Sequence, residues 1–332
     1  MNDKNTGTQK DERSQIYETI GKGEINHPLD GNDAQAVAAM REQTLPFKGQ
    51  MKGPEARVPF DQIMEHTPDA AGVTYENGTV GGVSGVWCRP EKPISEAAIL
   101  YFHGGGYVFG SAHAYRHLAG QFAARTGAVA FIADYRLAPE NPFPAAIDDA
   151  LAAYLGLVEN GAHRITIVGD SAGGGLTLSL LSILQNDPSK KQTVVPSAAV
   201  VMSPWTDLAR TGASYKDREE ADPIFTEKAI TDISKEYLNG ADPRDPRASP
   251  MYATLAGLPP VQIHVGTEEI LFDDSRSFAA RARSAKVDVA LHVWEGMPHV
   301  FASSVGTLQA AEEALEIMTR FLSAHLSNQT TA

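Results

Sequence analysis

Apolar and polar positions alternate in blocks along most of the chain from residue 82 onward. Short, nearly continuous apolar runs rich in β-branched residues predict strands at residues 82–90, 97–105, 128–136, 164–170, 198–205, 261–269 and 289–296. Longer runs with apolar positions three or four residues apart predict helices at residues 114–126, 144–160, 172–186, 275–286 and 308–326. The last helix has one apolar stripe, formed by Leu308, Ala311, Leu315, Met318 and Leu322. Apolar strands that alternate with helices indicate an α/β fold, with a mostly parallel sheet covered on both faces.

Two stretches depart from this alternation. Residues 15–64 have a weak helical pattern broken by Gly and Pro, which predicts a small helical appendage and not a part of the sheet. Residues 207–252 are rich in charge and proline. Because an insertion after a strand lies at the carboxyl edge of a parallel sheet, this stretch is predicted to be a lid. We therefore expect a core of residues 76–206 and 253–332, with a cap formed by 1–75 and 207–252.

Composition narrows the classes of partner. The 332 residues are 42% hydrophobic and 21% charged, as in a globular protein, and their net charge is −13. No basic cluster interrupts this acidic balance, which disfavours nucleic acids and anionic membrane surfaces as partners. The polar first 14 residues are expected to be disordered and are not a secretory signal, and no apolar stretch is long enough to span a membrane. Cys88 is the single cysteine, which excludes an intramolecular disulfide and a Cys-based metal site, so a cytoplasmic location is expected.

One serine stands between two glycines at the junction of a predicted strand and a predicted helix. The stretch "RITIVGDSAGGGL" covers residues 164–176 and places Ser171 between Gly169 and Gly173. In a strand–turn–helix junction this sharp, small side chains are needed two residues before and after the serine. The pattern is typical of a nucleophile elbow, although a glycine-rich turn with an idle serine has the same pattern.

A second glycine-rich stretch, "ILYFHGGGYVFG", begins within the predicted strand 97–105 and continues to residue 110. Gly104, Gly105 and Gly106 leave backbone N–H groups free of side chains, and such groups can stabilise an oxyanion on an attacked carbonyl. A nucleotide-binding loop is disfavoured because Gly104, Gly106 and Gly110 do not have the required spacing. A purely structural tight turn remains the other interpretation.

A nucleophilic serine needs a base and an acid that orients it. His299, in "WEGMPHVF", follows the last predicted strand on a loop where a base can reach the carboxyl edge of the sheet. His264 and His292 lie within strands and are interpreted as structural. The preceding strand end offers Glu268 and Glu269, followed by Asp273 and Asp274, which we interpret as caps of the next helix.

These motifs together resemble those of the hormone-sensitive-lipase-type family of bacterial α/β-hydrolase esterases. The similarity covers about residues 75–325 and includes "HGGGY", "GDSAGG", "DYRLAPENPFPAAIDD" and a terminal acid followed by histidine. The resemblance implies an α/β-hydrolase fold, with Ser171 as nucleophile and His299 as base. It places Glu269 at the acid position, where the family commonly has an aspartate followed by Pro-Leu. It also implies an oxyanion hole formed by Gly104, Gly105, Gly106 and Ala172, with His103 shaping the loop.

The expected function is a serine carboxylesterase acting on small esters with short- to medium-chain acyl groups, without a metal or an organic cofactor. The same machinery could act on an amide, an N-acetyl group or a lactone, and a non-catalytic receptor on this fold is the alternative of another class. Tyr107 and Trp205 are candidate pocket residues or core aromatics. Asp273 is the alternative acid, and the sequence leaves open whether the chain forms a homo-oligomer.

Overall fold

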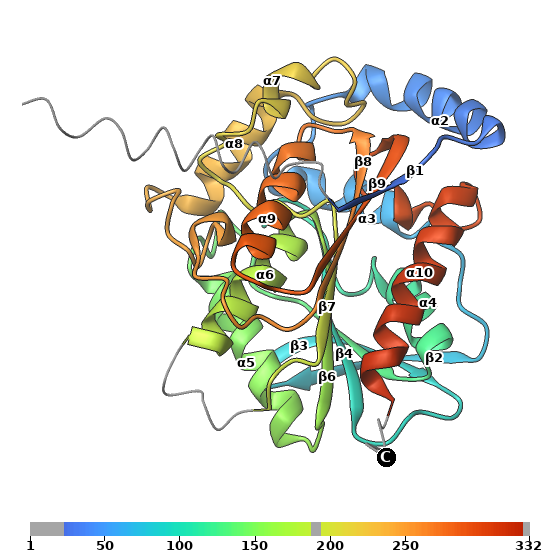
Figure 1. The fold of residues 1–332 in the computed structure, drawn as a ribbon, viewed down its shortest axis with the longest axis vertical. Helices are drawn as coiled ribbons and strands as arrows, with labels where there is room; N and C mark the ends of the chain where they lie inside the picture. The colour runs from blue at the N-terminus through green and yellow to red at the C-terminus, as the bar shows by residue number, and fades with distance from the viewer. Residues whose placement is uncertain (1–22, 187–193, 328–332) are drawn as a thin grey trace, which may run out of the picture.

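The computed structural model describes residues 23–186 and 194–327 (Figure 1), so the prediction for residues 1–14 lies outside the described part of the chain. A nine-stranded sheet in the order β1-β9-β8-β7-β6-β4-β5-β3-β2 forms its centre. The pairs among β1, β4 to β9 are parallel, whereas β3 is antiparallel to both β2 and β5. The strands are β1 (Glu24–His27), β2 (Val73–Val80), β3 (Val83–Pro90), β4 (Ala97–Phe102), β5 (Val129–Ala133), β6 (Arg164–Asp170), β7 (Ala198–Met202), β8 (Val261–Glu268) and β9 (Val289–Pro298).

Helices cover both faces of the sheet. In Figure 1, α4 and α10 lie on one side of the strands, and α5, α6 and α9 lie on the other. The α-helices are α2 (Gly31–Thr44), α3 (Arg57–Met64), α4 (Arg116–Thr126), α5 (Ala145–Glu159), α6 (Ser171–Asn186), α7 (Ser214–Asp217), α8 (Glu227–Leu238), α9 (Phe272–Ser284) and α10 (Gln309–Leu326). Short 3-10 turns span Leu45–Phe47, Pro54–Ala56, Pro250–Tyr252 and Phe301–Ser303. The predicted fold class, a mostly parallel α/β sheet between helical layers, is confirmed.

The apolar stripe of the last helix is buried as its spacing requires. Leu315, Met318 and Leu322 of α10 have no exposed surface, and they pack in the same core cluster as Leu118 and Phe122 of α4. A fully buried side chain of this size contributes roughly 1.5–3 kcal/mol through loss of apolar surface from water. The stripe therefore fixes α10 against α4 and against the middle strands β6 and β7 of the sheet.

The N-terminal segment is not purely helical, which corrects one prediction. Residues Glu24–His27 form β1, which pairs in parallel with β9 at the edge of the sheet. The His27 ring stacks on Trp294 with centroids 3.7 Å apart, and its Nε2 lies 2.9 Å from Nδ1 of His292. This strand is short and polar, so no apolar run in the sequence predicts it. Aromatic contacts with a distant part of the chain hold it in place. The half-exposed hairpin strand β2 had no apolar signal either.

The insertion after β7 leaves the core and returns at nearly the same point. The Tyr252 hydroxyl donates to Oδ1 of Asp207 at 2.9 Å, which joins the two ends of the predicted lid. Between these ends lie α7 and α8. In Figure 1, α7, α8 and α2 lie at the end of the sheet toward which β8 and β9 point.

Candidate active site

Ser171 lies on a strained turn between β6 and α6. Its φ of +52° is in the left-handed region, which a residue other than glycine adopts only when the surroundings enforce it. A Cβ on Gly169 would lie 2.3 Å from the Gly173 carbonyl oxygen, and one on Gly173 would lie 2.0 Å from that of Phe102. Both glycines are therefore required by close backbone approach, as the sequence spacing around Ser171 predicts.

The loops after two neighbouring strands bring Glu269 and His299 together. β8 and β9 are parallel neighbours, and Glu268 pairs with Pro298 at their carboxyl ends, so the residues that follow are adjacent. Nδ1 of His299 lies 2.8 Å from Oε2 of Glu269, and its Nε2 lies 2.9 Å from Oγ of Ser171. A hydroxyl, an imidazole and a carboxylate in this sequence can transfer the hydroxyl proton to the imidazole.

Burial and charge act in opposite directions on His299. Burial alone would lower its pKa, but the charge and hydrogen bond of Glu269, with the charges of Asp222 and Asp170, raise the pKa above its ordinary value of 6.5. Burial raises the pKa of Glu269 above its ordinary 4.5, and the His299 imidazole opposes that rise. The imidazolium form is thus stabilised by carboxylates on three different elements.

Asp273 and Asp274 do not cap α9, so the interpretation of these residues as helix caps is wrong. Oδ2 of Asp273 accepts from the backbone N–H of Ser214 at 3.0 Å. Oδ2 of Asp274 accepts from the backbone N–H groups of Thr206 and Asp207, each at 2.8 Å. These carboxylates bind the start of the insertion to α9 because the first turn of that helix faces the chain leaving β7.

The loop after β4 contacts Asp170, the residue that precedes Ser171. Gly105 and Gly106 have φ values of +109° and +62°, which favour glycine. The N–H of Gly104 donates to Oδ1 of Asp170 at 3.1 Å, so this amide is already used, contrary to its predicted place in the oxyanion hole. The amides of Gly105 and Gly106 remain as candidate donors, together with Ala172, whose position in the first turn of α6 leaves it without an intrahelical acceptor.

Asp170 connects the glycine loop to the turn that carries the serine. Besides Gly104, its carboxylate accepts from the hydroxyls of Tyr101 and Tyr115, each at 3.0 Å. Burial raises the pKa of Asp170 to about 6, against the effect of these three hydrogen bonds. The sequence motif contains this residue, but its role as the link between two loops depends on tyrosines that no motif identifies.

Tyr107 and Trp205 lie in the core directly behind the serine turn. Both are almost fully buried, and their ring centroids are 6.2 Å apart. The backbone N–H of Trp205 donates to the carbonyl of Ser171 at 2.9 Å, and the Tyr107 ring stacks on Tyr237 of α8 at 3.8 Å. The structure thus places both residues among the core aromatics, which is one of the two interpretations that the sequence left open.

The sequence predicts the insertion as a lid at this edge of the sheet but does not identify which of its residues contact the site. The ring edge of Phe225 packs against His299, with centroids 5.2 Å apart at 79°. Oδ2 of buried Asp222 accepts from the N–H of Ile270, the residue that follows Glu269. Nothing in the sequence marks these two residues, because their contacts form only when the insertion folds back over the sheet.

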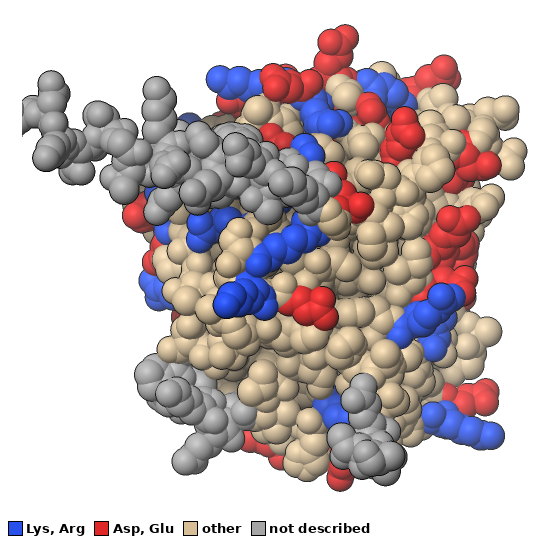
Figure 2. Space-filling model, in the orientation of Figure 1, with Lys and Arg blue, Asp and Glu red and all other residues tan. Residues whose placement is uncertain are grey.

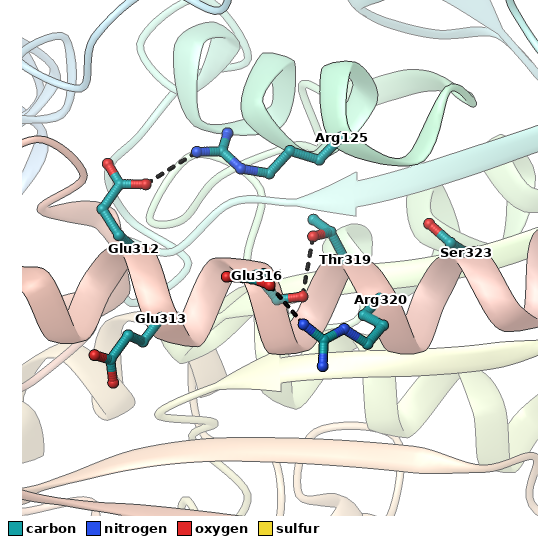
Figure 3. Close-up of a pocket in the computed structure, with 7 residues that line it drawn as sticks. All are labelled: Arg125, Glu312, Glu313, Glu316, Thr319, Arg320 and Ser323. Carbon is teal, nitrogen blue, oxygen red and sulfur yellow. Dashed lines mark hydrogen bonds and ion pairs between the residues drawn. The ribbon is translucent and has the colours of Figure 1, made fainter.

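A surface depression lies away from the candidate triad. It measures about 580 Å³ and lies beside α10, where Arg125 pairs with Glu312 and Arg320 with Glu316 (Figure 3). Four of its five charged side chains form these two ion pairs, so it lacks the convergent unpaired groups of a reaction centre. On the face drawn in Figure 2, basic side chains are scattered among acidic ones. Within residues 23–186 and 194–327, no group of three or more His, Cys, Asp or Glu side chains could hold a metal, and no helix could cross a membrane.

Comparisons with known proteins agree with this geometry. A family model described as the alpha/beta hydrolase fold matches residues 99–303, more than half of the chain. The acetyl-hydrolase of Streptomyces hygroscopicus is 38% identical over 268 residues, covering 80% of this chain and 88% of that protein. An esterase of Acinetobacter venetianus is 33% identical over 265 residues, covering 79% and 86%. A crystal structure of an esterase from the bacterial hormone-sensitive lipase family superposes with a TM-score of 0.83 at 34% identity, covering 90% of this chain and 100% of that one.

The fold, the geometry of the site and the similar proteins therefore all indicate the same family. The resemblance drawn from the sequence motifs is confirmed by relatives that cover most of the chain and by a structural neighbour of the same family. The chain belongs to the alpha/beta-hydrolase family that contains the bacterial hormone-sensitive-lipase-type esterases, and it is a carboxylic ester hydrolase.

Proposed function

We propose that the protein hydrolyses esters of short- to medium-chain acids through a Ser171–His299–Glu269 triad and a covalent acyl-enzyme. The observation that carries this assignment is the continuous pair of hydrogen bonds from Ser171 Oγ to His299 Nε2 at 2.9 Å and from His299 Nδ1 to Glu269 Oε2 at 2.8 Å. Both distances are in the range in which a proton can pass between a nucleophile and a positioned base, which supports the proposal.

In the proposed reaction, Ser171 Oγ attacks the ester carbonyl while its proton passes to Nε2 of His299. Glu269 holds the imidazole in the required tautomer and stabilises its charged form. The amides of Gly105, Gly106 and Ala172 receive the oxyanion of the tetrahedral intermediate. His299 then gives the proton to the leaving alcohol, and the acyl group remains on Ser171. A water molecule deprotonated by His299 releases the acid and restores the serine.

The cap is proposed to comprise the segments 1–75 and 207–252, and it favours a small acyl group. A methyl group added at Gly106 would lie 2.6 Å from Cγ2 of Ile233, so α8 closes tightly over the candidate oxyanion loop. The name of the Streptomyces relative, acetyl-hydrolase, is in line with a short acyl chain. We expect a preference for acyl chains of roughly two to eight carbons.

The test is a series of p-nitrophenyl esters of increasing acyl length, assayed with the wild type and with Ser171→Ala. We expect kcat/KM to be highest for the short and medium chains and to be lost in the variant. Faster turnover of emulsified long-chain triglyceride than of butyrate esters would contradict the acyl-length assignment, whereas full activity of Ser171→Ala would contradict the triad.

A further inference from the structure

A turn of the insertion, residues 219–225, lies between the N-terminal segment and the candidate triad. Its backbone carbonyls accept hydrogen bonds from three residues of the N-terminal segment. These bonds run from Lys48 Nζ to the carbonyl of Glu219, from the Arg41 guanidinium to those of Glu220 and Ala221, and from the Gly49 N–H to that of Ile224 at 2.9 Å. Both parts of the proposed cap therefore meet at this turn.

Asp222 is the buried centre of the turn. Its Oδ1 accepts from the backbone N–H groups of Ile224 at 2.7 Å and Phe225 at 2.9 Å, which closes the turn on itself. Its Oδ2 accepts from the N–H of Ile270 at 2.9 Å, outside the turn. One fully buried carboxylate thus ties the insertion to the peptide unit directly after Glu269.

The same turn also contacts the base. Oδ1 of Asp222 accepts from the N–H of Phe225 and so fixes the backbone position of that residue. The Phe225 ring packs edge-on against the His299 imidazole. The residue after His299 is held by the loop after β7, because the N–H of Val300 donates to Oγ of Ser203 at 3.0 Å. The insertion thus contacts the imidazole itself, and the loop after β7 holds the backbone next to it.

We propose that Asp222 is a positioning residue for ester hydrolysis. Its carboxylate holds the turn 219–225 against the loop that carries Glu269, so that the packing of the insertion and the alignment of the triad depend on the same hydrogen bonds. This proposal rests on the triad assignment made above. Asp222 contacts backbone amides and no reacting atom, so it acts through Glu269, Phe225 and His299.

The charge of Asp222 adds an effect that can be measured. The charged groups that face His299 are Glu269 on the loop after β8, Asp222 on the insertion and Asp170 at the end of β6, and all three raise the pKa of the imidazole. Phe225 faces the ring without charge. Removing the Asp222 charge must therefore lower the pKa of His299, even though Glu269 remains in place.

The deciding variants are Asp222→Asn and Asp222→Ser. Every partner of Asp222 is a donor, so the asparagine amide group must face either Ile270 or the pair Ile224 and Phe225, and one tie is broken. Asp222→Ser removes the charge, and its small hydroxyl can rotate so that its hydrogen does not face a backbone N–H group. This variant is used if Asp222→Asn does not fold. We expect a loss in kcat of roughly 10- to 100-fold for p-nitrophenyl acetate. We also expect the acid limb of the kcat/KM profile to move to lower pH.

The matched control is Asp207→Asn. Asp207 is also a buried carboxylate of the insertion and accepts from the backbone N–H groups of Ala209 at 2.9 Å and Thr211 at 2.8 Å, but its charge acts on Asp274 and Tyr215. We expect it to lower the thermal midpoint and leave the acid limb in place. If the Asp222 variants keep the wild-type limb and lose no more kcat than Asp207→Asn, the positioning role is wrong. Activity that survives Ser171→Ala would instead contradict the triad itself.

Discussion

The two sides of the site are held in place by different parts of the sequence. On the nucleophile side, which comprises Ser171 and residues 104–106, glycines within a few positions of the serine allow the backbones of β4, β6 and α6 to approach within contact distance. On the acid side, which comprises Glu269, His299 and the turn 219–225, segments 30 and 48 positions apart are joined by single hydrogen bonds. The first side depends on glycines that let backbone segments approach closely, and the second depends on side-chain hydrogen bonds. Substitutions should therefore affect them differently.

The largest effect is expected where both sides meet, at the serine itself. Ser171→Ala removes the group that forms the acyl-enzyme, and the loss of a triad nucleophile costs on the order of 10⁴-fold or more in kcat. The alanine relieves no packing constraint, so circular dichroism and the thermal midpoint should remain close to the wild type. Retention of more than a tenth of the activity on p-nitrophenyl acetate would rule out this nucleophile.

The acid side should be nearly as sensitive at one glutamate and insensitive at its neighbour. Glu269→Gln keeps the shape but removes the charge and favours the wrong imidazole tautomer, which costs about 10⁴-fold in kcat in a comparable triad. Glu268→Gln is the matched control, because this side chain is partly exposed at the end of β8. Steady-state kcat of the two variants makes the comparison, and equal losses would show that Glu269 is not the acid.

The nucleophile side should respond to a single methyl group. In Gly106→Ala, the added Cβ meets Ile233 at 2.6 Å at a φ of +62°, so the loop must shift. Loss of one oxyanion donor costs about 10²- to 10³-fold in kcat. Gly82→Ala provides the control, since Gly82 has a φ of +82° but open space around it. Gly82→Ala should lower the thermal stability but leave kcat unchanged. A similar loss of kcat in both variants would argue against the oxyanion role of Gly106.

The pH profile should report the raised pKa of His299. Because the base must be neutral, kcat/KM should fall as the pH decreases through a pKa that lies above 6.5. The residual activity of Glu269→Gln should show this limb at lower pH, because the variant lacks the charge that does most to raise the pKa of His299 against the effect of burial. A wild-type limb below 6.5 would mean that burial, and not the carboxylates, dominates the environment of His299.

The smallest effects are expected at the two aspartates that follow the acid. Asp273→Asn and Asp274→Asn keep an oxygen that can accept from the same backbone amides, so each should cost about 1 kcal/mol of unfolding free energy or less. Their kcat should remain near that of the wild type. If Asp273→Asn proves as damaging to kcat as Glu269→Gln, the acid has been assigned to the wrong side chain.

The sequence was sufficient wherever a residue's position follows from its immediate neighbours. The strand and helix that flank Ser171, the glycines that it needs and the placement of His299 after the last strand all follow from local patterns. Asp222 could not be found in this way, because its acceptor role depends on an amide 48 residues away. The edge strand β1 was not predicted for the same reason, because His27 is held by the distant rings of Trp294 and His292. The use of the Gly104 amide by Asp170 likewise requires the two loops to be seen together.

The proposed mechanism requires that Ser171 becomes acylated during turnover. The direct measurement is an acid quench of the wild type during the pre-steady-state burst with p-nitrophenyl acetate, followed by peptide mass mapping. We predict an acetyl group on the peptide that carries Ser171 in the wild type and none in Ser171→Ala, with a burst of p-nitrophenol equal to the enzyme concentration. An acetyl group on another residue, or turnover of the Ser171→Ala variant at the wild-type rate, would contradict the proposed mechanism.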